Sequence, residues 1–110
     1  MAELDLLSKG LTTCQGCPME LVGRAALEVL GPKTITMTPP SCSAILTGSC
    51  DETGWGIPSV QTVLMSLPAF ASGVSEALKI QGKNDVTVMG FAGDGGTFDI
   101  GFQALSGAIE

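Results

Sequence analysis

The spacing of apolar positions predicts a helix over Met19–Leu30 and a strand directly after it. In MELVGRAALEVL the apolar residues recur at helical spacing, and the Gly-Pro pair that follows is a typical helix stop. The next segment, Lys33–Thr38 (KTITMT), alternates β-branched residues with other side chains, as strands do. The PPSCSA stretch is expected to break regular structure, so that Cys42 lies in a loop at the end of this strand.

The second half of the chain repeats the alternation of helix and strand. Thr47–Pro58 is rich in Gly, Asp and Ser and predicts a loop, whereas Val60–Ile80 predicts a helix in two pieces joined at Pro68. Val86–Phe91 has the composition of a buried strand and runs into a glycine loop. From Phe98 onward the apolar residues return to helical spacing.

Alternating helices and strands predict an α/β fold with a parallel sheet and flanking helices. No linker or repeat divides residues 1–110, so we expect one domain without an internal boundary. Two or three strands make a thin sheet, and the last helical pattern has no stop signal. The sequence is therefore expected to be a truncated part of a longer chain.

Composition excludes several classes of function. The chain has 110 residues, 45% of them hydrophobic, so a packed core can form. Its net charge is −6 with only five Lys or Arg, which argues against a nucleic-acid partner. Because the chain has no His, His-dependent catalysis and Cys/His zinc sites are excluded.

The sequence shows neither a membrane span nor a signal peptide. Its apolar stretches are broken by Pro and polar residues, and its acidic start lacks the apolar core of a signal peptide. A cytoplasmic location is therefore expected. Since structural disulfides are rare in the cytosol, the four cysteines favour metal binding or redox chemistry.

The cysteines leave three kinds of site open. Cys14 and Cys17 form a CxxC pair in LTTCQGCPME, and Cys42 and Cys50 follow later. This spacing is compatible with a redox disulfide, a zinc site or an iron–sulfur cluster.

A glycine-rich loop, GDGGTFDIG, follows the last predicted strand over Gly93–Gly101. In α/β folds such a loop binds anions, because glycine allows close approach and the next helix presents free amides. An acidic residue inside an anion loop suits a bridging cation, so Asp94 is a candidate ligand of Mg²⁺ bound to a diphosphate. The alternative is a turn in which Asp94 caps the helix.

The loop FAGDGGTFDIGFQALSGAIE resembles the thiamine-diphosphate loop of the β subunits of 2-oxoacid:ferredoxin oxidoreductases, the pyruvate:ferredoxin oxidoreductase family. The CxGC turn, the cysteine after the first strand, WGIP at Trp55–Pro58 and ASG at Ala71–Gly73 extend the resemblance through most of the chain. The resemblance implies a thiamine-diphosphate-binding fold.

The resemblance also implies a 4Fe-4S cluster bound by Cys14, Cys17 and Cys42. The family's fourth ligand cysteine lies beyond residue 110, and Cys50 matches no ligand position. Cys50 is therefore either a spare thiol or a substitute ligand. Pro18 and Met19 depart from the family pattern directly after the second cysteine of the turn.

For the cofactor, the resemblance implies that Asp94 binds Mg²⁺ and that the loop around it binds the diphosphate. Ser41 flanks Cys42 and either faces the cofactor or satisfies a turn. Glu20 is either the acidic residue near the cofactor or a first-turn helix carboxylate. Asp99 and Trp55 are expected to be structural. The candidate cofactor-binding residues are Gly93, Asp94, Gly95, Gly96, Thr97, Ser41, Cys42 and Glu20.

The activity implied is oxidative decarboxylation of a 2-oxo acid, with electrons passing through the cluster to ferredoxin and coenzyme A accepting the acyl group. Other subunits of the oxidoreductase would complete the active site. Pyruvate, branched 2-oxo acids, 2-oxoglutarate and oxalate remain open as substrates. The alternatives are an iron–sulfur electron-transfer module without catalysis and a zinc-stabilised binding domain.

Overall fold

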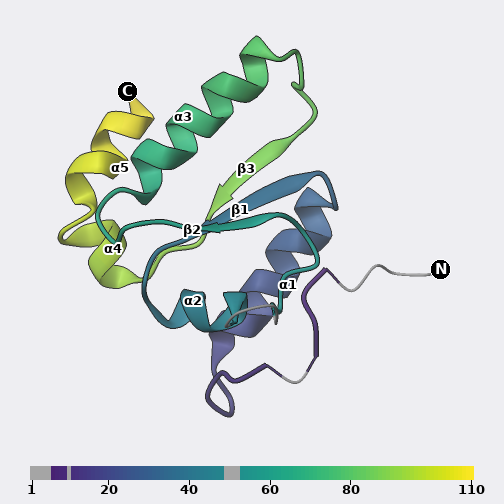
Figure 1. The fold of residues 1–110 in the computed structure, drawn as a ribbon. Coiled ribbons are helices and arrows are strands. Elements are labelled where there is room, and N and C mark those ends of the chain that lie inside the picture. The colour runs from purple at the N-terminus through teal and green to yellow at the C-terminus, as the bar shows by residue number, and fades with distance from the viewer. Residues whose placement is uncertain (1–5, 10, 49–52) are drawn as a thin grey trace.

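The computed structural model describes residues 6–9, 11–48 and 53–110. Its strands form a three-stranded sheet in the order β2-β1-β3, and both pairings are parallel. This confirms the predicted α/β class and the parallel sheet with flanking helices. The elements are α1 (Pro18–Leu30), β1 (Thr34–Thr38), α2 (Cys42–Thr47), β2 (Ser59–Gln61), α3 (Leu67–Ile80), β3 (Thr87–Gly90), α4 (Asp94–Phe98) and α5 (Phe102–Ile109) (Figure 1).

Helices cover both faces of the sheet. α1 and α2 lie on one face, and α3 and α5 lie on the other (Figure 1). The main core is on the α1 face, where Trp55 is buried and its ring meets that of Phe91 edge-on, with centroids 6.2 Å apart. Burial of each such side chain contributes about 1.5–3 kcal/mol. The buried members of this core are Leu7, Leu27, Leu46, Trp55 and Ile57.

The strongest sequence patterns agree with the structure. The helix begins at Pro18, one residue before its predicted start. Proline is tolerated there because an N–H in the first turn would have no partner within the helix. It ends at Gly31, which has a φ of +80°. The predicted strands around Thr34–Thr38 and Thr87–Gly90 are confirmed to within one residue at each end.

Four predictions of local structure were wrong. The helical pattern from Phe98 onward is interrupted, since α4 ends at Phe98 and α5 begins at Phe102. The PPSCSA stretch does not leave Cys42 in a loop: the prolines end β1, but Ser41 caps a new helix and accepts a hydrogen bond from the Ser43 amide at 3.3 Å. Val60 belongs to β2 rather than to a helix, because the segment pairs with β1. Pro68 is not a joint between helices but lies in the first turn of α3.

An ion pair joins the two loops that lead into β1 and β3. Lys33 donates to Asp85, which raises the pKa of the lysine and lowers that of the carboxyl; the hydrogen bond is the largest cause of both shifts. The lowered Asp85 pKa stabilises the fold above the carboxyl's unfolded pKa, and this stabilisation is lost as pH falls through the folded pKa. The raised pKa of Lys33 means that its ion pair stabilises the fold below the pKa of an unfolded lysine. This stabilisation is lost in strong alkali, as pH rises through the folded pKa.

Asp85→Asn is therefore expected to lower stability slightly at neutral pH and not at all in strong acid. The effect is small because the two side chains are 70% and 61% exposed. Urea unfolding of the wild-type and variant proteins across the acid range measures the difference. A difference that persists unchanged in strong acid would contradict the role given to this pair.

Candidate functional site

The carboxyl ends of the three parallel strands meet at one edge of the sheet. The chain passes from the central strand β1 to β2 on one side, whereas β3 lies on the other side. In open α/β sheets this reversal of direction creates a crevice, and ligands bind there at the carboxyl ends of the strands. The strand order therefore points to the ends of β1 and β3, where Ser41 and Gly93 lie.

The glycine loop after β3 packs directly on the ends of β1 and β2. A Cβ atom on Gly93 would lie 3.8 Å from the Ser41 Cβ. A Cβ on Gly96 would lie 3.4 Å from Leu64 atoms and 3.7 Å from Pro39 Cγ, so there is little room for a larger residue. The structure thus places Ser41 next to the glycine loop.

Asp94 is the first residue of α4, and its side chain is exposed. The N-cap position belongs to Gly93, which supplies no side-chain cap, so no cap acceptor meets the first amides of this helix. A Cβ on Gly95 would meet no atom within 4 Å. A carboxylate beside free amides and open space has the donor chemistry for a divalent cation bridging to a diphosphate, so these residues fit that group.

Cys14 and Cys17 share one tight turn. The Cys17 amide donates to the Cys14 carbonyl at 3.1 Å, and Gly16 between them has a φ of +73°, which favours glycine. Both thiols are free, as is that of Cys42, the exposed first residue of α2. The chemistry of three free thiols suits an iron–sulfur cluster.

The structure does not gather the predicted cluster ligands into one metal site. Within residues 6–9, 11–48 and 53–110, no group of three or more Cys, Asp or Glu side chains could hold a metal ion. Cys14 and Cys17 are brought together by their turn, whereas Cys42 lies on a separate element. Cys50 lies outside the described residues.

Glu20 takes part in an ion pair at the start of α1. Arg24 donates to Glu20 Oε1 from Nη2 at 2.8 Å and from Nε at 3.2 Å, and Thr13 Oγ1 donates to Oε2 at 3.2 Å. The hydrogen bond from Arg24 is the main cause that lowers the pKa of Glu20. Sequence reasoning missed Arg24, although Glu and Arg four residues apart on a helix is a recognisable pairing signal.

The other predicted residues have local partners. The Ser41 hydroxyl lies 2.6 Å from that of Ser43, in addition to its role as the N-cap of α2. Asp99 ends α4, and its backbone carbonyl accepts from the Phe102 amide at 3.1 Å where α5 begins. Ser41 therefore has a structural role at a helix end and also borders the glycine loop, whereas the bond at Asp99 involves only its backbone.

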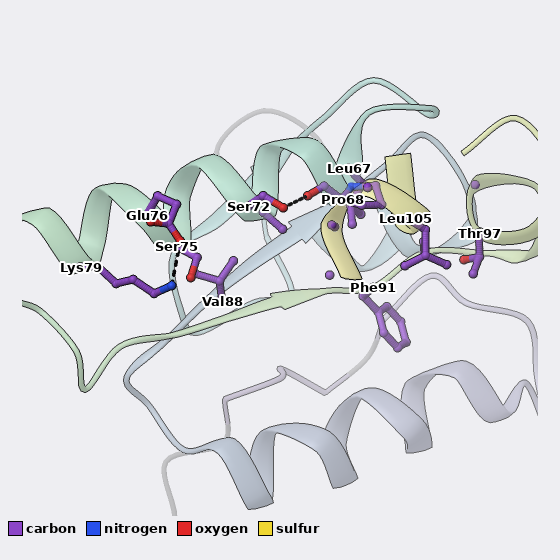
Figure 2. Close-up of a pocket in the computed structure, with 16 residues that line it drawn as sticks. Leu67, Pro68, Ser72, Ser75, Glu76, Lys79, Val88, Phe91, Thr97 and Leu105 are labelled. Carbon is purple, nitrogen blue, oxygen red and sulfur yellow. Dashed lines mark hydrogen bonds and ion pairs between the residues drawn. The ribbon is translucent and has the colours of Figure 1, made fainter. Parts of the chain in front are cut away.

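An open cavity of about 760 Å³ lies on the opposite face of the sheet from the main core, between α3, β3 and α5 (Figure 2). The glycine loop reaches it only through Gly96 and Thr97. The other end is polar, with Lys79 donating to Glu76 at 2.7 Å. Asp94 and Ser41 do not line this cavity, so it is distinct from the β1/β3 edge.

None of the helices in the described part of the chain has both the length and the apolar character needed to cross a membrane.

The fold is a parallel α/β sheet with a glycine-rich loop at the carboxyl edge of its strands, and comparison with known sequences narrows the family to which it is related. No protein-family model matches the chain. It is 45% identical over 108 residues to the pyruvate synthase subunit PorB of Methanothermobacter thermautotrophicus, covering 98% of this chain and 38% of that protein.

Two further relatives carry different substrate names. The ketoisovalerate oxidoreductase subunit VorB of Pyrococcus furiosus is 41% identical over 106 residues, covering 92% of this chain and 34% of that protein. The β subunit of the NADH-dependent phenylglyoxylate dehydrogenase of Aromatoleum evansii is 40% identical over 108 residues, covering 96% of this chain and 24% of that protein.

The chain is therefore homologous to the β subunits of 2-oxoacid:ferredoxin oxidoreductases over nearly its whole length. It spans between about a quarter and two fifths of the length of these relatives. The predicted resemblance is confirmed.

Proposed function

We propose that this chain forms the thiamine-diphosphate-binding part of a 2-oxoacid:ferredoxin oxidoreductase β subunit. The observation that carries the proposal is the GDGG loop, which packs against Ser41 at the β1/β3 edge and presents the first amides of α4 without a side-chain cap. The homology to PorB and VorB supports the same assignment.

Each part of the loop has a proposed role. Asp94 would bind Mg²⁺, and the backbone amides of Gly95, Gly96 and Thr97 would bind the diphosphate. Gly93 would let the backbone approach the ligand closely, because it carries no side chain beside Ser41. When bound, thiamine diphosphate supplies the electron sink that lets a 2-oxo acid lose carbon dioxide.

Cys14, Cys17 and Cys42 would bind a 4Fe-4S cluster that receives the electrons. Their free thiols supply the right donor chemistry, and the Gly16 turn presents two of them together. The family resemblance implies that a fourth cysteine ligand comes from outside residues 1–110. Cys50 is proposed as a spare thiol, with substitution for a missing ligand as the alternative.

The rest of the reaction involves partners. We propose that other subunits complete the active site, that ferredoxin accepts the electrons, that coenzyme A takes the acyl group, and that the complex works in the cytoplasm. The substrate would be a 2-oxo acid, since pyruvate, ketoisovalerate and phenylglyoxylate appear in the names of the relatives.

Cysteine substitution tests the cluster assignment in the complete purified complex. Cys42→Ser is expected to lose most of the iron assigned to this subunit and its electron paramagnetic resonance signal, because a hydroxyl is a poor ligand for a cluster. Cys50→Ser separates the two roles left for that residue: wild-type iron content identifies a spare thiol, and loss of iron identifies a substitute ligand. Full iron and an unchanged spectrum in Cys42→Ser would exclude that residue as a ligand.

The same preparations separate the alternative functions. An electron-transfer module without catalysis would retain iron but show no affinity for thiamine diphosphate. A zinc-stabilised domain would contain zinc without iron or sulfide. The oxidoreductase assignment requires both iron and thiamine binding.

A further inference from the structure

Arg24 on α1 forms hydrogen bonds with the segment that contains Leu7 and Ser8. Its Nη1 donates to the Leu7 carbonyl at 2.5 Å, and its Nη2 donates to the Ser8 carbonyl at 2.7 Å. The guanidinium also contacts Glu20 one turn earlier on the same helix. A planar guanidinium can satisfy several acceptors at once in a fixed geometry, which a lysine cannot reproduce.

The segment that Arg24 contacts is itself anchored to the core. Leu7 is buried and forms an antiparallel bridge with Trp55. The Ser8 amide donates to the Gly54 carbonyl at 2.8 Å, and the Gly56 amide donates to the Leu6 carbonyl at 2.8 Å. Arg24 therefore links α1 to a segment held at a fixed position by the Trp55 loop.

The hydrogen bonds that connect Arg24, Glu20 and Thr13 reach the turn that carries Cys14 and Cys17. Glu20 accepts from Arg24 through one carboxylate oxygen and from Thr13 through the other. Thr13 directly precedes Cys14, and Cys17 directly precedes α1. The turn that carries both thiols is thus attached to α1 at two points. After Cys17 the chain continues directly into α1, and before Cys14 the Thr13 hydroxyl donates to Glu20 on α1.

We propose that Arg24 and Glu20 are positioning residues that hold the Cys14–Cys17 turn against the start of α1, so that its two thiols are presented together to a cluster. The inference rests on the proposed iron–sulfur function of these thiols. Groups that orient metal ligands without touching the metal typically change metal affinity by about 10- to 100-fold when removed. Glu20 thereby acquires a role at the cluster rather than direct contact with thiamine.

The test compares Thr13→Val with Thr12→Val in the complete complex. Thr13→Val keeps the shape of the side chain and removes only the hydroxyl that donates to Glu20. Thr12 is an exposed neighbour and serves as the control. Transfer of iron to a chelator is followed by absorbance, alongside the thermal unfolding midpoint and the electron paramagnetic resonance spectrum.

We expect Thr13→Val to release iron about 10-fold faster than the wild type, with an altered spectrum and an unchanged unfolding midpoint. Glu20→Gln retains an acceptor oxygen for Thr13, so it should release iron more slowly than Glu20→Ala. Wild-type release rates in both Thr13→Val and Glu20→Ala would overturn the positioning role alone. A wild-type complex without iron at Cys14 and Cys17 would instead overturn the proposed cluster function, and the inference with it.

Discussion

In the complete complex, Asp94→Asn is expected to weaken thiamine diphosphate binding by about 100-fold at a fixed Mg²⁺ concentration. The amide keeps the size of the side chain but removes the negative charge that would bind the cation. Without that cation, the diphosphate loses its link to the protein at this position. Isothermal titration of thiamine diphosphate into the wild-type and variant complexes measures the change, and turnover should fall with it.

Asp99→Asn is the matched control for this experiment. Asp99 is also exposed and lies at the opposite end of the same short helix, so its substitution removes one charge from the same region. Its affinity for thiamine diphosphate is expected to stay within about twofold of the wild type, since an exposed side chain that is given no contact with the cation or the diphosphate has only a small effect. Equal affinity in the Asp94 variant and the wild type would refute the magnesium role.

Gly101→Ala is expected to destabilise the complete protein by about 3 kcal/mol. A Cβ at this position would lie 1.8 Å from the Gly96 carbonyl oxygen, which no side-chain rotation can relieve. The φ of Gly101 is −91°, so the cost comes from overpacking and not from backbone strain. Relief of the clash would move α4 relative to α5 and disturb the glycine loop. Denaturant unfolding and thiamine diphosphate affinity should therefore both change.

Gly107→Ala provides the comparison inside α5, the helix whose N-cap is Gly101. No atom lies within 4 Å of a Cβ placed there, and alanine favours helical structure over glycine by about 1 kcal/mol. This variant is expected to match or exceed wild-type stability. Equal stability of the two alanine variants would show that the close approach of Gly101 to Gly96 does not constrain the loop.

The parts of the fold that the sequence predicted are those with strong local signals. The helix before β1 has apolar residues at helical spacing, a proline at its start and a glycine directly after its end. β1 and β3 carry β-branched residues over several positions. Such signals require no knowledge of distant segments, and all three elements were predicted to within one residue at each end.

Two elements were missed: β2, which depends on pairing with a distant segment, and α2, which depends on a single capping residue. β2 has only three residues, and its identity as a strand comes from pairing with Thr36–Thr38. α2 exists because Ser41 caps it after two prolines that would otherwise indicate a loop. In both cases the local pattern is too short to decide the structure.

The candidate site also has features that the sequence could predict and features that it could not. The position of the glycine loop at the end of β3 could be predicted, because strand, glycines and helix follow one another in the sequence. The contact of Gly93 with Ser41 could not, since it depends on the strand order. The hydrogen bonds of Arg24 to the Leu7 and Ser8 carbonyls could not be predicted either, because these acceptors lie 17 and 16 residues earlier in the chain.

The most direct measurement is reduction of ferredoxin by the complete purified complex with a panel of 2-oxo acids, after thiamine diphosphate and Mg²⁺ have been removed and then restored. We predict that at least one of pyruvate, 2-oxoisovalerate, phenylglyoxylate, 2-oxoglutarate or oxalate supports reduction. We also predict that activity returns only when both thiamine diphosphate and Mg²⁺ are present. Full activity without thiamine diphosphate, or a thiamine-loaded complex that oxidises none of these acids, would contradict the proposed function.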